Sequence, residues 1–147
     1  MPVWLRTRGL QRRSVRRAQL AWRAEAMLEA LDLEDSELSI LLCDDASIRE
    51  LNREYRGKNK PTDVLAFPMW EGAEPSPNRE LLGDVVISIP TATRQAAERD
   101  RPIIAEVTFL LAHGILHLVG YDHQTRREEQ EMNAETERLL AAVDAAR

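Results

Sequence analysis

The 147-residue sequence contains few cysteines, aromatic residues and histidines. Its single cysteine, Cys43, excludes an internal disulfide and a metal cluster held by several cysteines. No apolar run approaches the roughly 18 residues that a membrane-spanning helix needs, and the start lacks the apolar segment of a secretory signal. We therefore expect a reducing, cytoplasmic setting and no membrane partner.

The remaining composition is that of an ordinary soluble protein, with 44% hydrophobic and 31% charged residues and a net charge of -5. A chain of this length has enough apolar residues for one core. We expect a single domain over residues 1–147.

Positive charge is concentrated at the start of the chain. Residues 1–23 contain no acidic residue and seven arginines: Arg6, Arg8, Arg12, Arg13, Arg16, Arg17 and Arg23. Such a segment is typical of a nucleic-acid contact face, of an organellar transit peptide or of a solvated helix face whose aliphatic stems extend an apolar row. The sequence leaves these three interpretations open.

Hydrophobic periodicity and turn residues predict alternating strands and helices. Strands are expected at about Val3–Thr7, Glu37–Cys43, Asp63–Phe67 and Asp84–Ile89. Helices are expected at about Ser14–Leu31, from a cap at Asp45 or Ser47 to Gly57, at Pro90–Asp100, at Ile104–Val119 and after Thr125.

Two capping boxes and one loop complete this prediction. Ser47 with Glu50, and Thr125 with Glu128, have the spacing at which a hydroxyl and a carboxylate cap a helix reciprocally. The segment between the third and fourth strands has no helical pattern, which argues against a purely parallel sheet. We therefore predict an α+β fold, a small mixed four-stranded sheet covered by about five helices.

All three histidines lie in one stretch, HGILHLVGYDH at residues 113–123. His113 and His117 are four residues apart and share one face of a helix. Gly120 can take a left-handed conformation that ends the helix, so that the chain brings back His123. Three imidazoles suit one Zn²⁺ ion and leave its fourth position open, as in catalytic zinc sites.

Three other residues bear on how this metal site is interpreted. The histidine spacing matches the metzincin peptidases, but Gly114 stands where those enzymes carry a general-base glutamate. Asp122 could be a fourth ligand of a structural zinc, a residue that orients a ligand, or the base. Glu106, two helical turns before His113, could reach the site or be a solvated charge.

The stretch HGILHLVGYDH, together with LNREYRGKNKPTDVLAFP at 51–68 and LLGDVVIS at 81–88, resembles the YbeY family of bacterial single-strand-specific metallo-endoribonucleases linked to ribosomal RNA maturation. The small departures are Asn59 and Ala66. The resemblance implies that His113, His117 and His123 bind zinc. It also implies that Arg56 faces the metal cleft, where a guanidinium can hold phosphoryl oxygens, with Lys58 and Lys60 attracting the RNA backbone.

The leading hypothesis is a zinc-dependent endoribonuclease acting on single-stranded ribosomal RNA, with ribosomal subunit components as partners and Arg56, His113 and Asp122 as catalytic residues. A further hypothesis has Asp63 pair with Arg56 and orient it. The alternatives are a non-catalytic ribosome-assembly factor with a structural zinc, and a metal hydrolase of another substrate, including peptides.

Overall fold

A computed structural model of the chain describes residues 3–10, 16–69 and 81–146. Its strands are β1 (Val3–Arg8), β2 (Glu37–Cys43), β3 (Val64–Pro68) and β4 (Leu81–Ser88). Its helices are α1 (Arg17–Ala30), α2 (Asp45–Arg56), α3 (Ile89–Glu98), α4 (Ile103–Leu118) and α5 (Arg126–Ala145). The predicted start of the first helix at Ser14 and most of the predicted loop before β4 lie outside the described residues.

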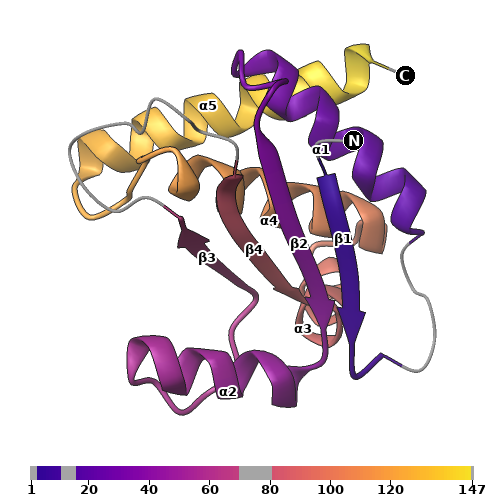
Figure 1. The fold of residues 1–147 in the computed structure, drawn as a ribbon, viewed down its shortest axis with the longest axis vertical. Coiled ribbons are helices and arrows are strands. Elements are labelled where there is room, and N and C mark those ends of the chain that lie inside the picture. The colour runs from indigo at the N-terminus through magenta and orange to yellow at the C-terminus, as the bar shows by residue number, and fades with distance from the viewer. Residues whose placement is uncertain (1–2, 11–15, 70–80, 147) are drawn as a thin grey trace.

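The four strands form one mixed sheet in the order β1-β2-β4-β3 (Figure 1). β1 is parallel to β2 and β2 is parallel to β4. β3 runs antiparallel to β4, with Val64 opposite Ile87. The predicted α+β class with a small mixed sheet is confirmed, and the strand order is new information.

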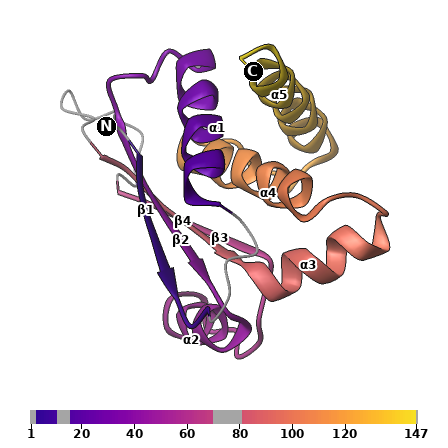
Figure 2. The ribbon, with the colours of Figure 1, turned by 90° about the vertical axis from the view of Figure 1, so that its right-hand side faces the viewer.

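Three helices, α1, α4 and α5, lie on the same side of the sheet (Figure 2), and the main core fills the space between them and the strands. α2 lies at one end of the sheet (Figure 1), where Ile48 packs with Cys43, Leu65 and Val86 in a smaller apolar cluster. Among the described residues, no single helix is long and apolar enough to cross a membrane; α3 and α4 pass that test only together, across a bend of 114°.

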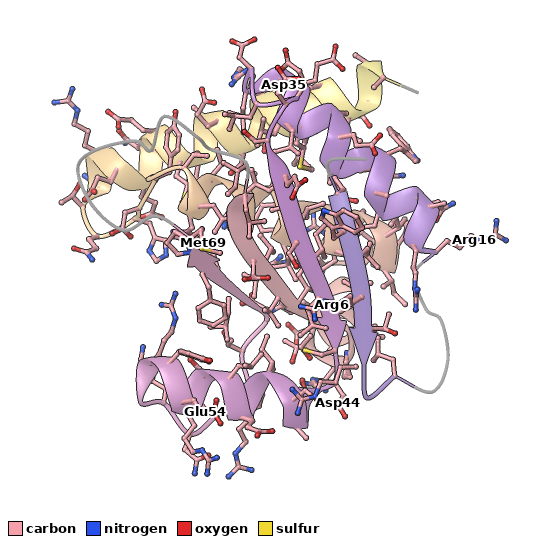
Figure 3. The ribbon with its side chains drawn as sticks, in the orientation of Figure 1. Arg6, Arg16, Asp35, Asp44, Glu54 and Met69 are labelled. Carbon is pink, nitrogen blue, oxygen red and sulfur yellow. The ribbon has the colours of Figure 1, made fainter. Side chains whose placement is uncertain are left out.

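The helix caps confirm one sequence prediction and correct another. Thr125 and Glu128 form the expected capping box at the start of α5. The cap of α2 is Asp44 (labelled in Figure 3), whose Oδ1 accepts the backbone N–H of Ser47 at 2.9 Å. The predicted cap at Asp45 or Ser47 is therefore wrong, and Glu50 bonds Arg8 at 3.5 Å instead.

The packing of α4 on the sheet requires a glycine at position 114. A Cβ atom added there would lie 2.5 Å from Cγ1 of Val85 and 3.0 Å from its Cγ2. Val85 is fully buried on β4, and its branched side chain has little freedom to turn aside. The same glycine that removes the peptidase base therefore allows the helix to approach the sheet.

We predict that Gly114→Ala lowers the free energy of unfolding by about 1–3 kcal/mol, because overpacking outweighs the better helix propensity of alanine. Denaturant unfolding measures the change. The double variant Gly114→Ala/Val85→Ala should lose at least about 1 kcal/mol less than the sum of the single variants. Additive losses would show that the two residues are not in steric conflict.

Candidate functional site

One open cleft of about 1220 Å³ contains the residues singled out from the sequence. Its walls come from the end of α2 and the turn after it, from β3, from α4 and from the turn after α4. Every predicted site residue lines it: Arg56, Lys58, Lys60, His113, His117, Asp122 and His123. The fold thus brings together two segments that lie about half the chain apart.

Arg56, Lys58 and Lys60 form a basic wall of the cleft, and its position depends on how α2 ends. Gly57 takes a left-handed conformation (φ 70°) and stops the helix directly after Arg56. The turn that follows is held by Asn52, whose Nδ2 donates to the carbonyl of Lys60 at 2.9 Å. Arg56 Nη2 donates to the carbonyl oxygen of Ala66 on β3 at 3.4 Å, which leaves the guanidinium beside the cleft.

The histidines come from α4 and from the turn after it. Gly120 (φ 104°) reverses the chain, while the N–H of Tyr121 bonds the carbonyl of Leu116 at 3.0 Å. This turn sets the rings of His117 and His123 5.3 Å apart, centre to centre. Two imidazoles bonded to one tetrahedral zinc ion place their ring centres about 5 Å apart, so this pair has the spacing of two ligands.

His113 has the features of a metal ligand in its uncharged form. Its Nε2 atom is buried and has no hydrogen-bond partner, which is costly for a polar atom unless something binds it. Burial, and then the neighbouring His117, lower the pKa of His113. Burial, and then His123, lower the pKa of His117. Neutral imidazole is the form that binds metals.

The histidines have the chemistry of zinc ligands. In the part of the chain that the structure describes, however, no three His, Cys, Asp or Glu side chains are placed so that they could hold a metal ion as they stand. His117 and His123 have the spacing of two ligands, and His113, whose ring packs on Phe109 with centres 4.4 Å apart, supplies the unpartnered nitrogen.

Two aspartates border the histidines. Asp122 accepts the backbone N–H of His123 at 2.7 Å and so shapes the turn that carries this residue. Asp63 accepts the N–H of Val64 at 2.7 Å and Nε2 of Gln95 at 3.2 Å. The hypothesis that Asp63 pairs with Arg56 is wrong, because Arg56 bonds a main-chain carbonyl instead. The negative charge of Asp63 acts on His113, whose pKa it raises against the larger effect of burial.

Comparison with known proteins identifies the family. The family model described as "Endoribonuclease YbeY" matches residues 9–144. The chain belongs to the endoribonuclease YbeY family. An endoribonuclease YbeY of Aquifex aeolicus is 48% identical over 131 residues, which are 89% of this chain and 85% of that protein. One of Persephonella marina is 47% identical over 120 residues, covering 82% of this chain and 78% of that protein.

A solved structure agrees with the fold. The solution structure of a Thermotoga maritima protein superposes with a TM-score of 0.64 and 27% sequence identity, covering 95% of this chain and 88% of that one. The YbeY family resemblance noted from three short blocks is thus confirmed over most of the chain.

Both sequence-based interpretations of Glu106, a residue that reaches the site or a solvated charge, are wrong. Its side chain is fully buried, and it is not among the residues that line the cleft. Its carboxylate accepts Arg99 Nη1 at 2.7 Å and Arg101 Nη2 and Nε at 2.6 and 2.8 Å. The sequence could have predicted this burial, because Glu106 lies on the apolar stripe of α4 with Ile103 and Leu110. A carboxylate at such a position needs cationic partners.

The described residues of the basic N-terminal segment do not line the cleft. Arg8 pairs with Glu50 at 3.5 Å, and Arg17 bonds Thr7 at 3.2 Å. Arg12 and Arg13 lie outside the described residues. A role of this segment in RNA binding remains a prediction separate from the cleft.

We predict that Glu106→Gln lowers the free energy of unfolding by about 1–3 kcal/mol, because two arginines lose their charge-assisted hydrogen bonds to a buried acceptor. Chemical denaturation measures the loss. The matched control is Glu131→Gln, which removes an exposed pair with Arg127 at 3.2 Å and should change stability by less than about 0.5 kcal/mol. Equal effects of the two substitutions would contradict the structural role of Glu106.

Proposed function

We propose that the chain is a zinc-dependent endoribonuclease that cuts single-stranded RNA during ribosomal RNA maturation, in the cytoplasm and in contact with ribosomal subunit components. The observation that carries the proposal is the convergence of three imidazoles, the guanidinium of Arg56 and two lysines on a single cleft. Membership of an endoribonuclease family supports RNA as the substrate.

The residues of the cleft have complementary roles. His113, His117 and His123 would hold one Zn²⁺ ion, which supplies a Lewis acid and an activated water when bound. Arg56 binds non-bridging oxygens of the scissile phosphate, where negative charge grows during the reaction. Lys58 and Lys60, on the same wall of the cleft, attract the flanking backbone.

Asp122 is the proposed proton acceptor. One of its oxygens, Oδ1, is occupied by the N–H of His123, and the residue lines the cleft beside His117, whose pKa it raises in opposition to burial and His123. The other oxygen, Oδ2, can take a proton from the attacking group. This role explains a carboxylate beside the histidines without making it a fourth ligand.

An aromatic pair supports the preference for single strands. Tyr55 and Phe67 both line the cleft, with ring centres 5.2 Å apart. Tyr55 is 67% exposed although it is large and apolar. An exposed ring beside a basic groove is a typical platform for unpaired bases, which duplex RNA does not offer.

We predict that His117→Ala binds zinc about 100-fold or more weakly and loses cleavage of a single-stranded RNA, because one of three ligands is missing. Zinc content, gel-based cleavage and far-UV circular dichroism are measured together. A chelator should likewise abolish cleavage by the native protein, and added zinc should restore it. Undiminished cleavage by His117→Ala would contradict a catalytic zinc; metal-dependent folding with no cleavage by the native protein would favour the assembly factor.

We predict that Arg56→Ala lowers kcat about 100- to 1000-fold without changing zinc content, because it removes stabilisation of the phosphoryl charge. Single-turnover cleavage of a single-stranded RNA measures this. Arg53→Ala is the control, since Arg53 is an exposed arginine of the same helix that does not line the cleft. If both variants cleave alike, Arg56 does not act on the scissile phosphate.

A further inference from the structure

A second cationic group borders the cleft where α3 is joined to α4. Its members are Arg99, Arg101 and the buried Glu106. Two guanidinium charges share one carboxylate, so this group carries one excess positive charge. None of the roles proposed above uses it.

The two arginines are bonded to Glu106 in different ways. Arg101 uses both Nε and Nη2 on Oε1 of the carboxylate. Arg99 uses Nη1 alone, on Oε2. Among the described residues its Nε and Nη2 atoms form no hydrogen bond, and this edge of a guanidinium can hold two oxygens of a phosphate.

The position of Arg99 directs it to the cleft. Arg99 lines the cleft, whereas Arg101 does not. The side chain of Arg99 is 51% exposed, while that of Glu106 is fully buried. Phe109 connects the group to the histidines: its ring lies 5.7 Å from the guanidinium carbon of Arg99 and 4.4 Å from the centre of the His113 ring.

We propose that Arg99 forms a phosphate subsite for the RNA strand, separate from the scissile phosphate that Arg56 contacts. The two arginines come from different elements, the end of α2 and the residue after α3, and line one cleft with the histidines. A strand bound across the cleft meets both. The inference rests on the proposed function, because it assigns a second contact to the same substrate.

The ion pairs make Arg99 a better phosphate ligand than a free arginine. A buried carboxylate holds the side chain in place, so that less conformational entropy is lost on binding. Arg101 offsets the negative charge of Glu106. The positive charge of Arg99 therefore still attracts an anion, although Arg99 is paired with Glu106.

The test is the salt dependence of binding to a fluorescently labelled single-stranded RNA, followed by anisotropy, with gels to verify that the RNA stays intact. Arg99→Ala should raise Kd several-fold and reduce the slope of log K against log salt concentration by about 0.7, the share of one phosphate contact on a single strand. Arg99→Lys should keep the slope, because the charge remains, but bind more weakly than the native protein, because the forked geometry is lost.

Arg94→Ala is the matched control. Arg94 lies on α3, pairs with Asp45 at 2.9 Å and has a side chain that is 59% exposed, but it does not line the cleft. The substitution Arg94→Ala removes one positive charge five residues before Arg99, and it should leave Kd and slope near native values. Equal slopes for Arg99→Ala and Arg94→Ala would overturn the subsite.

The two proposals fail in different ways. A native protein that cleaves RNA and loses activity in Arg56→Ala, but binds RNA as well in Arg99→Ala as in Arg94→Ala, overturns only the Arg99 subsite. A native protein that neither binds nor cleaves single-stranded RNA overturns the proposed function together with the subsite.

Discussion

The close approach of α4 to the sheet is the constraint on which the site depends. Gly114 faces Val85 of β4 at a distance that admits no side chain. His113 and His117 lie roughly a quarter turn or less around the same helix from Gly114, so contact of position 114 with the sheet orients both imidazoles to the cleft, which Gly114 also lines. A glutamate at position 114, as in the metzincins, would clash with the side chain of Val85. This site therefore differs from those peptidases in two ways: it lacks the general-base glutamate, and the packing of α4 on the sheet leaves no room for one at position 114.

The distribution of charge suits the cleft to a polyanion in a chain whose net charge is -5. Cations lie on two sides, with Arg56, Lys58 and Lys60 at the end of α2 and Arg99 at the start of the turn into α4. The histidines line the same cleft, and burial lowers the pKa values of His113 and His117. A phosphate backbone bound there would meet four cationic side chains, with Asp63 and Asp122 as the acidic residues of the lining.

Local patterns in the sequence predicted the grouping of the three histidines, from helical spacing and Gly120, and the strands within a few residues. The place of Arg56, Lys58 and Lys60 in the cleft was implied by the family resemblance, and Arg99 was not predicted. What the sequence could not supply depends on contacts between distant segments. The strand order, the bond of Arg56 to the carbonyl of Ala66 and the pairing of Glu106 with two arginines all require the tertiary fold. The cap of α2 was misplaced by one residue because Asp44 and Asp45 are both competent acceptors.

The central claim is that three imidazoles bind one zinc ion and leave a position open for chemistry. X-ray absorption spectroscopy of the zinc-loaded protein tests it most directly. We predict a first shell of four nitrogen or oxygen neighbours at about 2.0–2.1 Å, with multiple scattering from three imidazoles, and the same first shell in Asp122→Asn. A first shell that changes in that variant would show that Asp122 is the fourth ligand of a closed, structural site and would contradict the claim.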